Sequence, residues 1–319
     1  MKKTGIVLAL SVGCITFSVN TQAQGIYFGL GGGYGFAAAK ADFGSYPIEA
    51  GESKSTQTVT NGTVQSSTLY TANSFSLGKG INLGLFGGYM INKNVGVELG
   101  IGYLFGSSTQ STEENDQTNI SSGSFQPTVT ETSTSITTVI VKGSMLRLTP
   151  SLRLQCGEAK IHPYAVVGLI IGVAGKFTKN SEDITSYANS QSTGTPPAPQ
   201  PNSDDVNILT YNGGISFGFH GAVGVNYLLT EKLGIFAELA GNYQDFSPDK
   251  GVLTTSTTNG SDNLPKMTVN ETQTTYSSTF TSTSGGPATP GTPYGAPSFH
   301  IPFSSYGFTI GVHFTLGGK

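Results

Sequence analysis

The 319-residue chain is poor in charge, has no tryptophan and contains two cysteines. Charged residues make up 11% of it, well below the roughly 25% of an ordinary soluble domain. Cys14 falls in an N-terminal segment that we expect to be removed, so Cys156 alone can form neither an intrachain disulfide nor a cysteine metal site. Beyond that segment, no apolar run reaches the roughly 18 residues of a membrane-spanning helix. The chain also lacks a basic patch or stripe, so nothing indicates nucleic acid as a partner.

The N-terminus has the pattern of a secretory signal peptide. Two lysines are followed by an apolar run and then by small residues that end at Ala23. We predict a signal peptide over residues 1–23, cleaved near Ala23. Loss of its two lysines would change the formal charge of the chain from −3 to −5. Cys14 raises the alternative of a lipoprotein, but a lipobox has leucine three residues before its cysteine, where this chain has Ser11. We therefore interpret Cys14 as part of the apolar core of the leader.

Glycine, serine and threonine are abundant instead, and apolar residues alternate with them along the chain. The clearest stretch is residues 81–105, INLGLFGGYM-INKN-VGVELGIGYLF. In its second half, bulky apolar side chains share one face, while glycines and Glu98 share the other. This period of two indicates a strand with one apolar face. The polar turn at residues 92–94 can join only antiparallel neighbours, so the stretch predicts a β-hairpin.

Six further segments show the same alternation, so that eight strands are expected. Besides the two strands of the hairpin, they cover residues 25–36, 139–156, 161–177, 207–227, 233–246 and 305–316. Three connections are tight turns, whereas the other four are long, covering approximately residues 37–74, 107–138, 178–206 and 247–304. An even strand number with short turns at one end and long loops at the other is typical of outer-membrane barrels. We predict an all-β fold, an eight-stranded antiparallel transmembrane β-barrel with four long extracellular loops and three short periplasmic turns.

A soluble β-sandwich is the alternative, since its strands alternate too. Three features favour the barrel. The less apolar face is mostly glycine and alanine, with hardly any of the lysine and glutamate that a solvated face would carry. Aromatic residues gather near both ends of the strands, as in the interfacial girdles of membrane barrels. A closed barrel also removes the exposed edges that such apolar strands would present.

Parts of the long loops also have the pattern of strands. Asn61-Gly62 carries the signal of a tight hairpin turn. Residues 128–141 and 267–280 alternate threonine with larger apolar residues, and threonine suits a solvated strand. Pro150 is awkward inside an expected strand because proline cannot donate to the ladder, so we expect a bulge there.

The alternation places six charged or histidine side chains in the lumen: Glu98, Arg147, Arg153, His220, Glu238 and His313. Glu98 and Arg153 lie on neighbouring strands at similar height and should face each other. Buried charges are tolerable only when paired and hydrogen-bonded, so the first interpretation is a structural network that fills a narrow lumen. The second is the polar lining of a small aqueous path, because eight strands leave an interior that side chains can just fill.

Nothing in the sequence favours catalysis. A catalytic site needs a nucleophile, a base and an orienting group within hydrogen-bond reach. His300 near Ser298 and His220 near Ser216 are expected by chance in a chain this rich in serine. Four scattered histidines do not indicate a metal site, and the glycines lie within strands rather than at a phosphate-binding turn. We therefore expect no enzyme, no cofactor and no metal.

Several stretches resemble a known family: GIYFGLGGGYGF, the hairpin at 81–105, MLRLTPSLRL, IHPYAVVGLIIGVAGKF, LGIFAELAG and the closing YGFTIGVHFTLG. They are similar to the outer-membrane β-barrels of OmpA, OmpX and opacity type, with the character of members from Bacteroidetes. The resemblance covers all eight strands but not the loops. It implies a Gram-negative cell surface and a barrel that serves as an adhesin, a structural element or a small pore, and it carries no catalytic residues.

These observations lead to two functional expectations. The first is an adhesin-like scaffold in the cell outer membrane that presents threonine- and serine-rich loops to a surface ligand or host cell. The second is a porin-like channel for small solutes. We expect a monomer that contacts outer-membrane lipid and lipopolysaccharide.

Overall fold

The computed structural model describes residues 25–38, 51–72, 75–123, 126–157, 160–191, 198–279 and 291–316. The predicted signal peptide at residues 1–23 lies outside them. Within these ranges the chain forms seventeen strands, a 3-10 helix η1 (Leu264–Lys266) and a short helix α2 (Val269–Thr272). None of the helices in the described part is long and apolar enough to cross a membrane.

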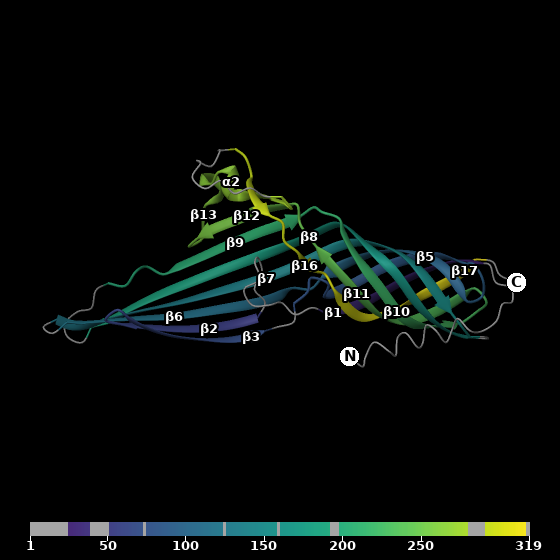
Figure 1. Ribbon diagram of the computed structural model, residues 1–319, viewed down its shortest axis with the longest axis horizontal. Helices are drawn as coiled ribbons and strands as arrows, with labels where there is room; N and C mark the ends of the chain where they lie inside the picture. The colour runs from purple at the N-terminus through teal and green to yellow at the C-terminus, as the bar shows by residue number, and fades with distance from the viewer. Residues whose placement is uncertain are drawn as a thin grey trace.

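Eight strands pair side by side into a ring. They are β1 (Gly25–Ala37), β4 (Gly80–Met90), β5 (Val95–Gly106), β7 (Gln126–Gln155), β8 (Ile161–Gln191), β10 (Ser216–Leu228), β11 (Leu233–Phe246) and β17 (Ser305–Leu316). Each pairs antiparallel with the next in this order, and β17 pairs again with β1. Closure leaves no strand edge in this part of the chain, and we call the ring the barrel (Figure 1).

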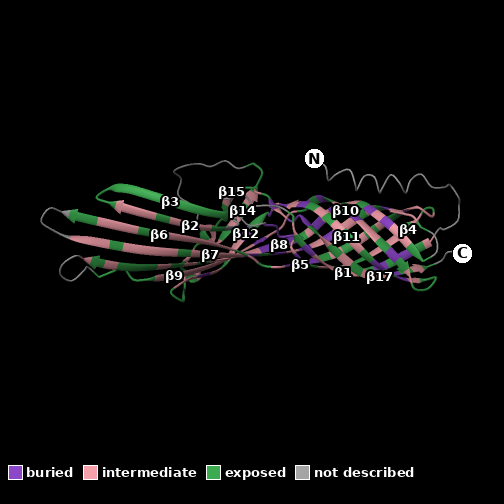
Figure 2. Cartoon of the chain, turned by 90° about the horizontal axis from the view of Figure 1, so that it is seen from below, coloured by how far each residue is buried: buried purple, intermediate pink, exposed green. Residues whose placement is uncertain are grey.

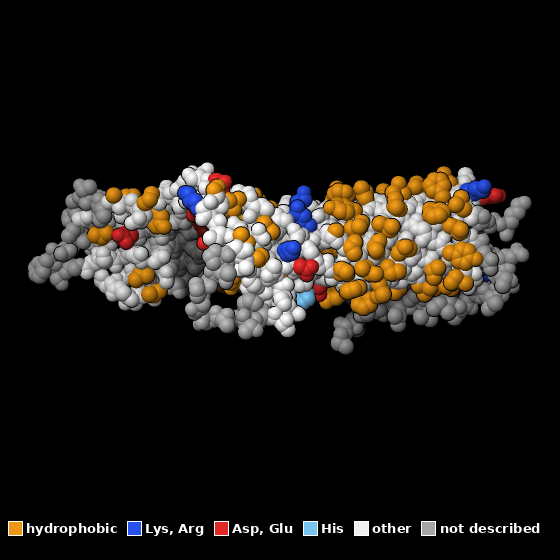
Figure 3. All heavy atoms as spheres, turned by 90° about the horizontal axis from the view of Figure 1, so that it is seen from above, with side chains coloured by type: hydrophobic (Ala, Val, Ile, Leu, Met, Phe, Trp, Pro, Cys, Tyr) orange, Lys and Arg blue, Asp and Glu red, His pale blue; other side chains and the backbone are white. Residues whose placement is uncertain are grey.

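The two faces of the barrel strands differ as the alternation predicts. Large apolar side chains point outward and are left uncovered by protein, with Leu85 57% and Phe217 71% exposed. Exposed and less exposed residues alternate along these strands in Figure 2. In Figure 3 hydrophobic side chains cover the barrel, whereas charged ones gather beyond its two ends. The surface of the barrel is therefore apolar where a bilayer would touch it.

The predicted hairpin at residues 81–105 is confirmed as β4 and β5, but the prediction of one continuous strand at 207–227 is wrong. It is divided into β9 (Ser203–Asn212), outside the barrel, and β10. Gly213 and Gly214 separate the two, with φ angles of 96° and 74°. Only glycine adopts such angles without strain, so two adjacent glycines end one strand here and begin the next.

The other strands form a sheet that continues beyond one end of the barrel, to the left in Figure 1, and we call it the extension. They are β2 (Gly51–Thr60), β3 (Thr63–Ala72), β6 (Thr109–Gly123), β9, β12 (Lys250–Thr258), β13 (Ser261–Asp262), β14 (Gln273–Ser277), β15 (Tyr294–Pro297) and β16 (Ile301–Pro302). The main sheet of the extension has the order β3-β2-β6-β7-β8-β9-β12-β14-β15, with the upper parts of β7 and β8 at its centre. The segments expected as loops therefore consist largely of strands, because threonine-rich alternation sustains a ladder in water as well.

A β-bulge marks the border between the barrel and the extension. The register between β7 and β8 shifts between Ser144 and Leu146, and Ala174 on the partner strand has a φ of 52°. The bulge expected at Pro150 is absent, since the register is the same on both sides of that residue. Pro150 instead pairs with Leu99 of β5, and the β7–β8 ladder simply lacks pairings at this point.

Three expectations for the loops can be compared with the extension. The hairpin turn at Asn61-Gly62 is confirmed: β2 and β3 pair on either side of it, and both residues have positive φ. Residues 128–141 are confirmed as part of β7. The range 267–280 is only partly a strand, because Thr268 and Glu271 form a capping box that starts α2 before β14 begins.

An apolar cluster closes the end of the barrel that faces the extension. Its buried members are Phe75, Leu77, Leu104, Val141, Met145, Phe177, Tyr211, Phe246, Ile301 and Phe303. They come from barrel strands, from the extension and from the two segments that lead into β4 and β17. Phe177 stacks on Tyr211 with the ring centroids 4.3 Å apart, and Phe246 meets Phe303 edge to face. This cluster is the main hydrophobic core of the molecule.

The environment of outward leucines can be tested by mutation. Leu85→Lys places a charge midway along a barrel strand and should cost about 2–4 kcal/mol of the free energy of unfolding in lipid vesicles. Leu69→Lys in the extension is the control, since Leu69 is 71% exposed and a change on a solvated surface stays within about 0.5 kcal/mol. Urea unfolding in vesicles measures both, and equal losses would contradict a lipid-facing barrel surface.

Candidate functional site

The lumen gathers the six side chains predicted to lie there. Glu98 comes from β5, Arg147 and Arg153 from β7, His220 from β10, Glu238 from β11 and His313 from β17. Each alternates with outward apolar neighbours, and the period of two of the strands turns all six inward. The structure joins them in three separate groups, described from the end with the short turns upward.

The first group is centred on a buried ion pair between Arg153 and Glu98. Arg153 Nη1 lies 3.2 Å from Glu98 Oε2, and the two side chains are 3% and 11% exposed. The Tyr27 hydroxyl donates a second hydrogen bond to the same carboxylate oxygen at 3.1 Å. A glutamate thus receives two donors from two different strands, and this satisfies a charge that would otherwise be costly to bury.

Arg153 extends this group across the lumen. Its guanidinium carbon lies 3.7 Å from the centroid of the Tyr164 ring, a cation–π contact, and 5.4 Å from that of Tyr27. The Tyr164 hydroxyl in turn donates to Glu238 Oε2 at 3.1 Å. The series of contacts Tyr27–Glu98–Arg153–Tyr164–Glu238 therefore links β1, β5, β7, β8 and β11. We call it the cross-lumen network.

Aromatic and amide side chains fill the lumen around this network. His313 is 7% exposed, packs its ring 5.4 Å from that of Tyr27 and lies 3.3 Å from the Asn226 amide. Phe86 and Phe236 meet edge to face with centroids 5.5 Å apart. Glycines make room for these rings, since a Cβ on Gly29 would lie 2.0 Å from the Phe86 ring. Inward glycines thus accommodate larger side chains instead of leaving the lumen open.

Arg147 forms the second group, directly under the apolar cluster. Its Nε donates to Gln244 Oε1 at 2.9 Å, and its Nη2 donates to the Phe303 carbonyl at 3.0 Å. Gln244 Nε2 donates onward to the Ser216 hydroxyl at 2.8 Å. Arg147, Gln244 and Ser216 are all less than 10% exposed. The guanidinium therefore ties β7 to β11 and to the segment that leads into β17.

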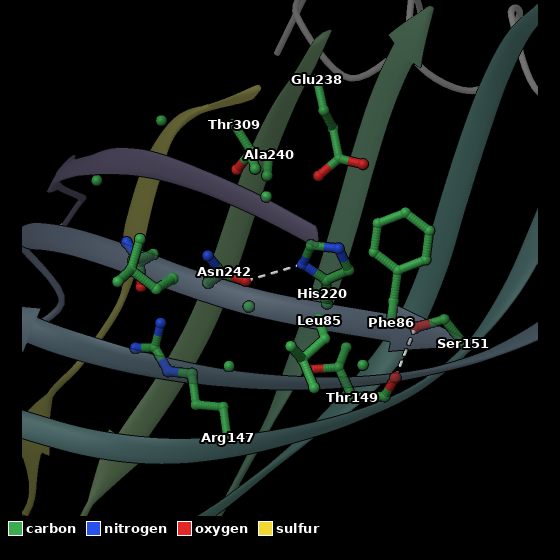
Figure 4. A pocket seen from close by; sticks show the side chains of 18 of the residues that line it. Leu85, Phe86, Arg147, Thr149, Ser151, His220, Glu238, Ala240, Asn242 and Thr309 are labelled. Carbon is green, nitrogen blue, oxygen red and sulfur yellow. Dashed lines mark hydrogen bonds between the residues drawn. The ribbon is translucent and has the colours of Figure 1, made fainter. Parts of the chain in front are cut away.

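The third group pairs His220 with Asn242. His220 Nδ1 lies 2.9 Å from Asn242 Oδ1, and Asn242 Nδ2 donates to the Ser305 hydroxyl at 3.3 Å. Between these groups is a cavity of about 170 Å³, lined among others by Arg147, His220 and Glu238. In Figure 4 these three side chains and the His220–Asn242 pair surround it. The lumen therefore contains a chamber with several polar side chains on its lining, which we call the polar chamber.

Sequence reasoning missed several members of these groups. Tyr27 was visible on the inner face of its strand, but only its position opposite Glu98 shows its role. Tyr164 lies in the predicted strand at 161–177, where the alternation is least regular. Gln244 and Asn242 are uncharged and so did not stand out, although their even spacing from Glu238 places all three on one face. Among the described residues, no group of three His, Cys, Asp or Glu side chains could hold a metal ion.

Comparison with known proteins identifies the class. Residues 7–280 match the outer membrane protein β-barrel domain family. The chain belongs to this family, and we place it in the outer membrane. Among solved structures it is similar to the outer membrane protein OprG from Pseudomonas aeruginosa, with 13% identity and a TM-score of 0.35 over 93% of this chain and 98% of that one. A search of curated proteins gave no match.

The buried ion pair gives a direct stability test. Glu98→Gln leaves Arg153 buried without its carboxylate and should lower the free energy of unfolding by about 3–5 kcal/mol. The double variant E98Q/R153M removes both charges and should recover much of that loss. Lys54→Gln is the control, since it removes an ion pair to Glu114 on the exposed surface of the extension and should leave stability unchanged within error. Additive losses in the double variant would contradict coupling between the two residues.

Proposed function

We propose that this protein is a surface scaffold, in which the barrel anchors the extension outside the cell and the extension meets a partner. One observation carries the proposal: nine of the seventeen strands in the described part lie outside the ring, while the lumen is crossed by side chains and capped by the apolar cluster. A chain whose lumen is obstructed, and nine of whose described strands lie outside the ring, is suited to presenting a surface.

The proposal includes an orientation and a processing step. Short connections join β4 to β5, β7 to β8 and β10 to β11, and the extension rises from the opposite end of the barrel. In barrels of this class the short turns face the periplasm. The extension would then be extracellular, the leader would be cleaved near Ala23, and lipopolysaccharide would surround the outer half of the barrel.

The two edges of the extension sheet differ in a way that favours β3 as the contact. The opposite edge, β15, has four residues and ends at Pro297. In contrast, β3 is ten residues long, TVQSSTLYTA, with no charge and no proline. Natural proteins usually protect long edge strands with lysine, proline or a bulge. Val64 and Leu69 are 55% and 71% exposed, so β3 also offers apolar side chains to a partner.

The hydrogen-bonding pattern identifies the backbone groups that a partner would use. Thr60 and Thr63 close the two-residue turn as a hydrogen-bonded pair, so bonding alternates from there along the hairpin. Val64, Ser66 and Thr68 then direct their backbone groups away from β2. An extended segment that added itself to this edge would gain main-chain hydrogen bonds, with specificity from alternate side chains. We propose an uncharged, extended polypeptide segment as the partner, bound by one copy of the barrel.

Proline substitution tests the edge. Ser66→Pro removes one outward N–H but no bond to β2, so it should abolish binding while the barrel stays folded. Ser66→Ala is the matched control and should bind normally. The probe is a fluorescent peptide with the β3 sequence, applied to cells that display each variant, with surface amount measured by antibody. Equal binding by all three proteins would contradict the β3 edge as the contact.

The polar chamber favours a second candidate, a channel for small solutes. A channel would need the cross-lumen network to move, because Arg153 and Tyr164 occupy the centre of the lumen. Catalysis has less support: His220 bonds Asn242, whereas Ser216 bonds Gln244 and Met145.

Planar bilayers separate the scaffold from the channel. We expect no steady single-channel openings from the wild type, since the network and the apolar cluster both block the path. Arg153→Ala is the comparison, because it opens the network at its centre. Wild-type openings whose size changes in this variant would establish the channel and remove the main argument for the scaffold.

A further inference from the structure

Arg147 is a buried cation whose bonded partners are all neutral. It is 6% exposed and donates to an amide oxygen and to a backbone carbonyl. Arg153, at 3% exposed, differs because Glu98 neutralises it. The remaining carboxylate that lines the chamber, Glu238, accepts from Tyr164 as part of the cross-lumen network. Among the described residues no acidic side chain forms an ion pair with Arg147.

This arrangement is costly unless an anion compensates it. A guanidinium keeps its proton in proteins, so burial cannot remove the charge. Leaving such a charge buried and unpaired is strongly destabilising. Neutral acceptors satisfy two of the three nitrogens of Arg147, but they do not cancel its positive charge. A mobile anion would do so, provided that the third nitrogen is accessible to it.

The third nitrogen, Nη1, has access to the chamber. Arg147 lines the chamber, and of its nitrogens only Nε and Nη2 donate to partners in the described part of the chain. The side chain keeps 6% of its surface exposed and lines the chamber, so Nη1 is the nitrogen left to meet a ligand there. Figure 4 shows the guanidinium at the border of the chamber, on the side where Asn242 lies. Asn82 and Ser305 line the same space and add amide and hydroxyl groups.

We propose that the chamber binds one small monovalent anion, of halide or carboxylate size, against Nη1 of Arg147. The chamber measures about 170 Å³, whereas a single water needs roughly 10–15 Å³, so an anion fits together with part of its hydration shell. The apolar cluster above Arg147 and the cross-lumen network on the other side limit the size of an anion that this space accepts. The site does not depend on the proposed scaffold function.

Bromide is the direct probe. Crystals of the full mature protein grown in sodium bromide should show an anomalous peak within hydrogen-bond distance of Arg147 Nη1. Bromide bound only at surface lysines, with ordered water at Nη1, would overturn the proposal. This experiment needs no variant and therefore does not depend on whether a mutant barrel folds.

An internal carboxylate provides the second test. Gln244→Glu puts a negative charge on the atom that already accepts from Arg147 Nε, with almost no change in shape. The thermal midpoint of the wild type should rise as bromide or acetate replaces gluconate at constant ionic strength, because a ligand that binds only the folded state stabilises it. In Q244E that rise should vanish, and its midpoint in gluconate should exceed that of the wild type.

The control is Gln57→Glu, which adds the same charge to β2 in the extension and should keep the anion-dependent rise. An equal rise in Q244E and the wild type would place the effect elsewhere and overturn the proposal. If the midpoint of the wild type is the same in all three salts, the anion does not bind in solution and the proposal fails.

Discussion

Closure of the eight-stranded ring is the constraint on which the rest of this structure depends. In lipid there is no water to satisfy a backbone N–H or carbonyl, so each strand must bond to a neighbour on both sides. The return of β17 to β1 meets this demand, and it leaves the alternation of each strand to separate two environments. Outward leucines and phenylalanines meet lipid, while inward residues must pack in the limited space that eight strands enclose.

The inside of the ring is governed by electrostatics in a confined volume. Arg153 is neutralised by Glu98 and covered by Tyr164, so one side chain links three strands. Glycines at positions such as Gly29 and Gly224 accommodate the rings of Phe86 and Tyr164. Small and large residues thus complement each other across the lumen. Arg147 departs from this pattern, because its partners are neutral and it borders the polar chamber.

The extension follows from strands that do not stop at the membrane border. β7 and β8 continue past the bulge at Ala174, and their apolar alternation gives way to threonine, serine and a few charges. The backbone hydrogen bonds between β7 and β8 continue on both sides of this change, because paired strands are stable in water as well as in lipid. The remaining strands add to this central pair on both sides. They leave one edge, β3, that is long and uncharged.

The sequence by itself determined the class of fold, the hairpin at 81–105, the turn at Asn61-Gly62 and the inward set from Glu98 to His313, because a period of two decides the face of every residue in a strand. It does not show where a solvated strand ends, so it predicts strands in only parts of the extension and one continuous strand across Gly213-Gly214. Only the tertiary structure decided which inward residues meet, as with Tyr164 on Arg153 and Gln244 on Arg147. Those contacts depend on the stagger between strands and on the closure of the ring. Neither can be read from the sequence of a single strand.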